Sequence, residues 1–308
     1  MLPLRPKFAI IFWLLILFLS ACQTNTSPVA PTSEPTTVIP ATPTLILPTK
    51  ILASQTPSAT PSPTAVMTAL ADFSNLESEL IEGVDWFILV QDANSDEILF
   101  ERNPDTSFPP ASLIKIPTAM AVLSILEDQG RTLEDLKTYG IADRNFDSLL
   151  EAMVVYSEES AAEALEYFAR GDNRLQNKLD AWGLTNTKYD PRTSTARELL
   201  ASLELLNTRA ALNEENSHYL LNLMGSYTEN DQILLGKLLD QLPDCAFLNK
   251  RGTMLGPTIV SDMGILMCGE RGWYLVVAGT PAVDSQATFE DIQASIEAFA
   301  VAFASLVK

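Results

Sequence analysis

The stretch Phe108-Pro109-Pro110-Ala111-Ser112-Leu113-Ile114-Lys115-Ile116-Pro117 decides how this chain folds and where its chemistry lies. Its prolines end an extended pattern, and an apolar helical pattern begins at Ala111. Ser112 and Lys115 are three positions apart, so they share one face at the N-terminus of the predicted helix. A serine hydroxyl needs a base within hydrogen-bonding distance to act as a nucleophile. The spacing therefore predicts a nucleophile, Ser112, with Lys115 as its base; the alternative is a capping serine and a solvated lysine.

The predicted helix N-terminus suits this chemistry in two ways. Its free N–H groups and the positive end of the helix dipole stabilise a developing oxyanion. The same positive end, together with burial, lowers the pKa of a nearby lysine, which can then accept a proton. Lys115 lies between two isoleucines in an apolar run, and a buried lysine requires a partner or a chemical role.

Two further motifs follow in the order that a single site would need. Ser157, in a Tyr-Ser-Glu-Glu segment, can pass a proton to a leaving group; the alternative is a helix-capping serine. Lys250, in an Asn-Lys-Arg-Gly segment, can attract a substrate carboxylate; the alternative is a surface charge. Gly252 lets substrate lie close to the backbone. We predict that Ser112, Lys115, Ser157 and Lys250 form one catalytic site.

The N-terminal 66 residues predict export and a tether. A positively charged start precedes an apolar run, 8–19, that is too short to span a bilayer, and Leu-Ser-Ala-Cys ends it. Residues 1–22 are therefore predicted to be a lipoprotein signal, cleaved before Cys22, whose thiol is lipidated. The alternatives are an uncleaved anchor or a simple secretory signal. Residues 23–66 hold nine prolines among Thr and Ser and predict a disordered tether. We expect an extracytoplasmic protein, lipid-anchored to the bacterial cell membrane.

The length of residues 67–308 suits either one large domain or two closely packed lobes. Strand patterns occupy 86–91, 97–101, 247–253, 259–267 and 273–278. A helix follows Ala111, and from about 132 to 242 we expect only helices and loops, the helices at 133–136, 146–155, 161–168, 175–182, 196–206 and 217–224. A last helix covers 289–307. Tight turns between the strands favour an α/β fold of the α+β kind, an antiparallel five-stranded sheet flanked by helices with a helical lobe, about 120–242, inserted.

The net charge and the few histidines and cysteines exclude several classes of function. The net charge of −19 repels nucleic acid and anionic lipid, so we expect a small-molecule or uncharged-polymer partner. We also expect a monomer. The single histidine, His218, lies in an apolar helical stretch, and no cysteines have metal-ligand spacing, so neither a His-based triad nor a metal or other cofactor is expected. Cys245 and Cys268 face each other if the hairpin turns near Gly256-Pro257. A disulfide is then geometrically possible; the alternative is two buried thiols.

The three motifs together carry a resemblance. Residues 108–117 resemble the active-site segment of class A β-lactamase-like, penicillin-recognising serine hydrolases. Residues 153–162 resemble their Ser-Asp-Asn element, and Lys250-Arg251-Gly252 resembles their Lys-Thr-Gly strand. The likeness runs from about 75 to 305 and implies an α/β-sandwich lobe, an all-helical lobe and a site between them.

The resemblance also implies roles for individual residues. A β-lactam or a related cell-wall amide would acylate Ser112, with Lys115 as base. Ser157 would be the proton shuttle and Lys250 the electrostatic partner of the substrate. The oxyanion would be bound by the backbone N–H groups of Ser112 and Thr253.

Three departures from the family pattern limit these roles. Glu159 replaces an amide that donates to substrate; an ionised carboxylate cannot donate, but it can pair with Lys115 and hold it charged. Arg251 replaces a hydroxyl residue, and can bind the substrate carboxylate or pair with Glu159. No Glu-x-x-Leu-Asn element precedes Thr195, and Asp190 fits poorly as a base for water.

Together these observations predict a membrane-tethered serine hydrolase that a β-lactam or related amide acylates, a chemistry associated with antibiotic resistance. Without a carboxylate that activates water, the acyl-enzyme is expected to hydrolyse slowly. The alternatives are a catalytically impaired member that binds cell-wall or peptide ligands, and a D-Ala-D-Ala peptidase.

Overall fold

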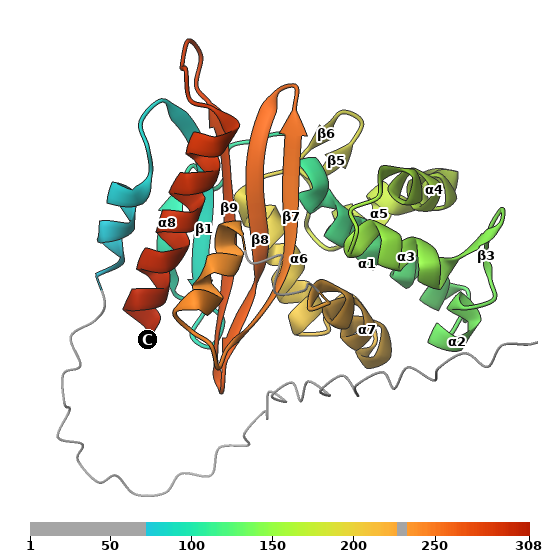
Figure 1. The fold of residues 1–308 in the computed structure, drawn as a ribbon. Coiled ribbons are helices and arrows are strands. Elements are labelled where there is room, and N and C mark those ends of the chain that lie inside the picture. The colour runs from blue at the N-terminus through green and yellow to red at the C-terminus, as the bar shows by residue number, and fades with distance from the viewer. Residues whose placement is uncertain (1–71, 227–232) are drawn as a thin grey trace, which may run out of the picture. The chain divides into compact units, whose positions relative to one another are not determined.

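The computed structural model describes residues 72–226 and 233–308. The predicted lipidation at Cys22 and the tether at 23–66 lie outside these residues. Five strands form one antiparallel sheet, as predicted, and their order is β2-β1-β9-β8-β7 (Figure 1). The strands are β1 (Val84–Asp92), β2 (Ile98–Arg102), β7 (Ala246–Leu255), β8 (Thr258–Cys268) and β9 (Arg271–Pro281).

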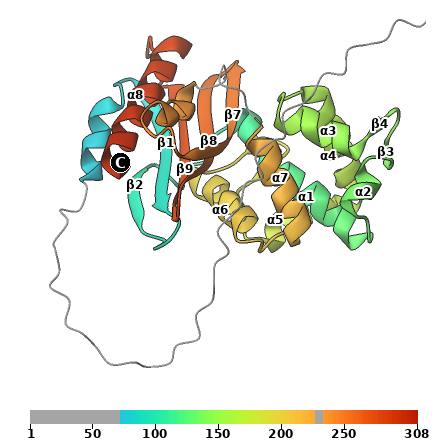
Figure 2. The same ribbon diagram turned by 60° about the horizontal axis from the view of Figure 1, so that its bottom comes forward.

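The helices agree closely with the sequence periodicity. They are α1 (Lys115–Asp128), α2 (Leu133–Leu136), α3 (Phe146–Val154), α4 (Glu159–Arg170), α5 (Arg174–Ala181), α6 (Ala196–Asn207), α7 (Glu214–Met224) and α8 (Phe289–Val307). The described 3₁₀ segments are η1 (Phe73–Glu79), η2 (Ala111–Ile114), η3 (Gly171–Asn173) and η5 (Leu234–Asp240). Figures 1 and 2 both show α1 to α5 gathered beside β7, on the side away from α8. Among the described helices, none is long and apolar enough to cross a membrane.

The prediction that only helices and loops lie between 132 and 242 was wrong at two places. Two small hairpins lie there, one formed by β3 (Gly140–Ile141) and β4 (Arg144–Asn145), the other by β5 (Lys188–Tyr189) and β6 (Arg192–Thr193). Strands of two residues are too short to show an alternating pattern in the sequence. The second hairpin turns at Asp190-Pro191 and becomes important at the site.

One face of the sheet packs against α8. On β1, the alternating residues Trp86, Ile88 and Val90 are fully buried in a core that also contains Phe299 and Phe303 of α8. Such alternation is what a strand between two layers requires, because successive side chains point to opposite faces. Thr288 begins α8 with a capping box, in which its side chain accepts from the backbone N–H of Asp291.

The other face of the sheet holds the segment that leads to Ser112. Phe87 of β1 stacks on Phe108, with ring centroids 4.6 Å apart. The backbone of Phe108 exchanges two hydrogen bonds with Ser194, at 2.9 and 3.0 Å. These bonds join the chain just before η2 to the chain just before α6, so two sides of the candidate site are fixed to each other.

A disulfide links Cys245 to Cys268, with the Cα atoms 4.4 Å apart. The hairpin of β7 and β8 turns at Gly256-Pro257, as predicted, because Leu255 pairs with Thr258. The geometric expectation of a disulfide is therefore confirmed in the structure, and the alternative of two free thiols is not.

Candidate active site

Ser112 lies in the single 3₁₀ turn η2, directly before α1. The residues that cap η2 and α1 at their N-terminal ends are Pro110 and Ile114, so Ser112 is not a capping residue. Ala111 has a positive φ of 48°, a left-handed conformation that costs a non-glycine residue free energy. Such strain is commonly found at functional sites, and here it is next to the predicted nucleophile. The side chain of Ser112 is half-buried.

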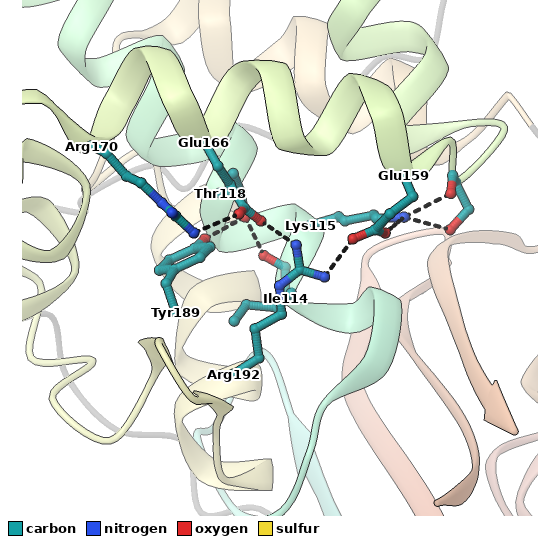
Figure 3. A network of polar contacts seen from close by, with 9 residues as sticks. Ile114, Lys115, Thr118, Glu159, Glu166, Arg170, Tyr189 and Arg192 are labelled. Carbon is teal, nitrogen blue, oxygen red and sulfur yellow. Dashed lines mark hydrogen bonds and ion pairs between the residues drawn. The ribbon is translucent and has the colours of Figure 1, made fainter. Parts of the chain in front are cut away.

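Lys115 is the first residue of α1 and is only 2% exposed. Its Nζ donates to the carbonyl oxygen of Ser157 at 2.7 Å and lies 3.4 Å from the Ser157 hydroxyl. The carboxylate of Glu159 is 3.0 Å away. The alternative of a solvated lysine is therefore wrong, and two of the predicted motifs meet at this amine (Figure 3).

Ser157 occupies a second strained position. Its φ is 57°, and the residue that caps α4 is Glu158, so the alternative of a capping serine does not hold. The turn is held from outside by Arg144, whose guanidinium is 2.7 Å from the Glu158 carboxylate and also donates to the carbonyl of Ser148. The surrounding contacts thus fix Ser157 in a conformation that it would not adopt alone.

Lys250 lies on β7 and is 1% exposed, so it is not a surface charge. Burial, followed by the positive charges of Lys115 and Arg251, lowers the pKa of Lys250 to about 7. The electrostatic interaction between Lys250 and Lys115 indicates that β7 and the start of α1 contribute to one site.

Gly252 follows on the same face of β7 as Lys250. A Cβ atom at this position would lie 3.2 Å from the Leu113 side chain and 2.6 Å from the hydroxyl of Ser261. Only glycine allows β7 to approach η2 so closely. Leu113 is the neighbour of Ser112, so the glycine brings the third motif against the turn that carries the predicted nucleophile. Thr253, the next residue, is exposed.

Arg251 points to the opposite face of β7, because side chains alternate along a strand. Its register partner is Asp262 of β8, and the charge of Arg251 is among those that act on this carboxyl. Asp262 is fully buried and accepts from the Asn249 side chain and the backbone N–H of Leu235. Burial raises the pKa of Asp262 to about 7.

Glu159, the first residue of α4, is shared between two cations. Besides Lys115 it binds Arg192 of β6, whose Nη1 is 2.6 Å from Glu159 Oε1. Burial acts to raise the pKa of Glu159, but the bonds from Arg192 and Lys115 outweigh it and lower the pKa. The predicted pairing of Glu159 with Lys115 is confirmed, and the arginine that binds Glu159 is Arg192.

Arg192 also binds Glu166 of α4, at 2.8 Å from Nη2, so its guanidinium lies between two carboxylates (Figure 3). Glu166 is 4% exposed, and burial raises its pKa despite Arg192 and the more distant Arg170. The pKa of Arg192 is raised by Glu159 and Glu166, although burial opposes this.

Arg192 and Glu166 were not predicted from the sequence. The signal for Glu166 was present: it lies among the apolar residues Ala162, Leu165 and Ala169, on the buried side of α4. Arg192 gave no signal, because only the β5–β6 hairpin brings it to a residue 33 positions away. Asp190, at the exposed turn of this hairpin, faces solvent. The single histidine, His218, is half-buried on α7 beside Arg209 and is not part of the constellation described above.

Comparison with known proteins gives the class. The chain belongs to the β-lactamase enzyme family, whose model matches residues 72–299. It is thus a β-lactamase-like serine hydrolase.

Solved structures share its fold. The TLA-3 extended-spectrum β-lactamase matches with a TM-score of 0.62 and 19% identity, over 76% of this chain and 98% of that chain. The β-lactamase from Sphaerobacter thermophilus DSM 20745 matches with a TM-score of 0.62 and 15% identity, over 77% and 98%. An ancestral class A β-lactamase, GNCA, matches with a TM-score of 0.61 and 24% identity, over 77% and 98%.

A curated protein is also similar in sequence. The D-alanyl-D-alanine endopeptidase of Pseudomonas aeruginosa PAO1 is 30% identical over 40% of this chain and 47% of its own length. The chain therefore matches about half of that relative.

Proposed function

We propose that this hydrolase is acylated at Ser112 by a β-lactam or a related cell-wall amide, and that it hydrolyses the acyl-enzyme slowly. The observation that carries the proposal is the meeting of three motifs. Lys115 binds Ser157, the charge of Lys115 helps to lower the pKa of Lys250, and Gly252 packs against the turn of Ser112.

In the proposed acylation, each of the four predicted catalytic residues has one role. Lys115 takes the proton from the Ser112 hydroxyl as its oxygen attacks the carbonyl carbon. The N–H groups of Ser112 and Thr253 bind the resulting oxyanion. As the C–N bond breaks, Ser157 passes a proton to the leaving nitrogen, and Lys250 attracts the substrate carboxylate.

Slow hydrolysis of the acyl-enzyme follows from the groups that surround the site. Water attack needs a positioned general base, and in the family pattern that base is a carboxylate. Glu159 and Glu166 are both engaged by arginine or lysine, and Asp190 faces solvent. The same reasoning favours a second candidate function, a D-Ala-D-Ala peptidase, which the similarity to a D-alanyl-D-alanine endopeptidase also supports.

The test incubates the full-length protein in detergent with a chromogenic cephalosporin, a fluorescent penicillin and a peptide ending in D-Ala-D-Ala. Stable fluorescent labelling that is lost in Ser112→Ala is the expected result. Ser305→Ala, which alters an exposed serine of α8 three positions before Lys308, is the matched control and should be labelled normally. Rapid cephalosporin turnover would instead indicate a true β-lactamase, and release of D-alanine a peptidase. A wild-type protein that reacts with none of the three would refute the proposal and leave a binding function.

We also propose that a lipid on Cys22 anchors the protein outside the cytoplasm. The support is the sequence of the N-terminal segment, in which small residues and a cysteine end an apolar run. Cells fed an alkyne fatty acid should label the wild-type protein and not Cys22→Ser. Equal labelling of the two proteins would contradict the anchor.

A further inference from the structure

Four charged side chains form a chain of contacts that begins at the predicted base. Lys115 binds Oε2 of Glu159 at 3.0 Å, and Oε1 of the same carboxylate binds Arg192 at 2.6 Å. Arg192 continues to Glu166 at 2.8 Å. Figure 3 shows these side chains in contact one after another, from Lys115 at the start of α1 to Glu166 of α4. The carboxylate of Glu159 thus lies between two cations, with one oxygen toward each.

Glu159 alone would oppose the chemistry proposed for Lys115. A carboxylate beside an amine favours the ammonium form, and an ammonium cannot accept the proton of Ser112. A nearby guanidinium counteracts this effect, because it compensates the charge of the carboxylate and competes for its lone pairs. The contact from Arg192 to Glu159 is the shorter of the two.

Other charged groups around Lys115 come from several elements. Lys250 and Arg251 lie on β7, and Glu166 lies on α4, about two helical turns after Glu159. The positive charges of Lys115 and Arg251 both help to lower the pKa of Lys250, because like charges disfavour one another. Tyr189 of β5 is neutral, since burial raises its pKa above the usual value. Of the described groups in direct contact with Lys115, Glu159 is the one that carries a negative charge, while the Ser157 carbonyl accepts a hydrogen bond from the same amine.

Arg192 is held in place on its far side. Glu166 is 4% exposed and binds the second guanidinium nitrogen, so Arg192 cannot swing into solvent without leaving a buried carboxyl group without that partner. The hairpin that carries Arg192 is also fixed, because the hydroxyl of Tyr189 is hydrogen-bonded to Thr118 of α1.

We propose that Arg192 is a positioning residue for acylation: by binding Oε1 of Glu159 it weakens the hold of that carboxylate on Lys115. Lys115 then gives its extra proton to solvent water and enters the step as a neutral amine. The proton of Ser112 moves to Lys115 as the bond from the serine oxygen to the carbonyl carbon forms. This role rests on the proposed function of Ser112 and Lys115, and it explains how the family site accommodates a glutamate in place of an amide.

The first experiment measures the rate of labelling of the full-length protein by fluorescent penicillin between pH 5.5 and 9.5. In Arg192→Gln the midpoint of the rising limb should move up by about one pH unit, which lowers the rate near pH 7 about tenfold. In Glu159→Gln it should move down. The double variant should return toward Glu159→Gln, because no carboxylate remains for the arginine to offset. Arg170→Gln removes a contact of Glu166 but none of Glu159, and should leave the midpoint unchanged.

A merely structural role for Arg192 would give a different pattern. The rate would fall equally at every pH, and the double variant would be at least as slow as Arg192→Gln; this result would overturn the proposal. Thermal unfolding of each variant identifies any that fail to fold.

A second experiment keeps the inference separate from the proposed function. The signals of lysines labelled with ¹³C at Cε are followed by NMR through a pH titration, and Lys115→Arg identifies the signal of Lys115. This signal should titrate at a higher pH in Arg192→Gln than in the wild type. This titration can be measured even if no substrate reacts with Ser112. An unchanged titration would refute the role of Arg192 regardless of activity.

Discussion

Replacing Gly252 by alanine should damage both the fold and the predicted site. The new methyl group would lie 2.6 Å from the hydroxyl of Ser261 and 3.2 Å from two atoms of Leu113. Neither neighbour can move away easily: Ser261 is fully buried and donates to the Gly252 carbonyl at 2.8 Å, and Leu113 is fully buried on η2. Overpacking of this kind costs about 1–3 kcal/mol. For a domain of this size, 2 kcal/mol corresponds to a fall in Tm of about 4–8 °C.

The displacement should also reach Ser112, which adjoins Leu113. A shift of about 1 Å in a reacting group can cost on the order of 100-fold in rate, so labelling by fluorescent penicillin should fall at least about tenfold. Tm is measured by calorimetry and the labelling rate by gel fluorescence. Gly272→Ala on β9 is the matched control, because its methyl group would come no closer than 3.4 Å to Ala93. The double variant Gly252→Ala with Ser261→Ala should recover part of the loss. Equal Tm and labelling for Gly252→Ala and the control would refute the reasoning.

Three further predictions concern stability. Replacing Cys245 and Cys268 by alanine removes a cross-link between residues 23 positions apart and should lower the free energy of unfolding by about 3 kcal/mol, as measured in urea. Asp262 has a folded pKa of about 7 against about 4 when unfolded, so the folded state binds the extra proton between these values and wild-type stability should fall as pH rises from 4 to 7. Asp262→Asn should reduce that slope, and the raised pKa of Glu166 contributes to what remains. Glu198→Ala removes the acceptor of the Asn186 amides and should cost about 2 kcal/mol.

Each of these predictions has a result that would contradict it. The disulfide prediction would be contradicted if, without reductant, the wild type and the double alanine variant unfolded at the same urea concentration. For Asp262, it is an identical pH slope in the wild type and the asparagine variant. For Glu198, it is a loss no larger than that of Glu214→Ala, an exposed acid at the start of α7.

Periodicity predicted most of the fold because its elements have long faces. The last helix was predicted at 289–307, the bounds that α8 has, since its apolar stripe continues without interruption. The five strands were found because they alternate or run apolar between turn residues. The hairpins at 140–145 and 188–193 were missed because each strand has two residues, and their pairing depends on tertiary context.

The site was predicted as far as its motifs extend. Ser112, Lys115 and Ser157 carry their spacing and context in the chain itself. The contacts of Arg192 do not, because its two partners lie 26 and 33 positions away and reach it only through the β5–β6 turn. The burial of Lys250 could not be predicted either, because a lysine counts as polar in a hydrophobicity pattern. In the structure it is enclosed by the elements packed on β7.

The middle strand of the sheet comes from the end of the chain. β1 pairs along its whole length with β9, from Val84 opposite Pro281 to Asp92 opposite Trp273. During synthesis, nearly the entire remaining chain must therefore be made before β9 can pair with the free edge of β1. Such distant pairing slows folding and leaves an open strand edge exposed meanwhile. A chain that stopped before Arg271 would have two separate hairpins with nothing between them.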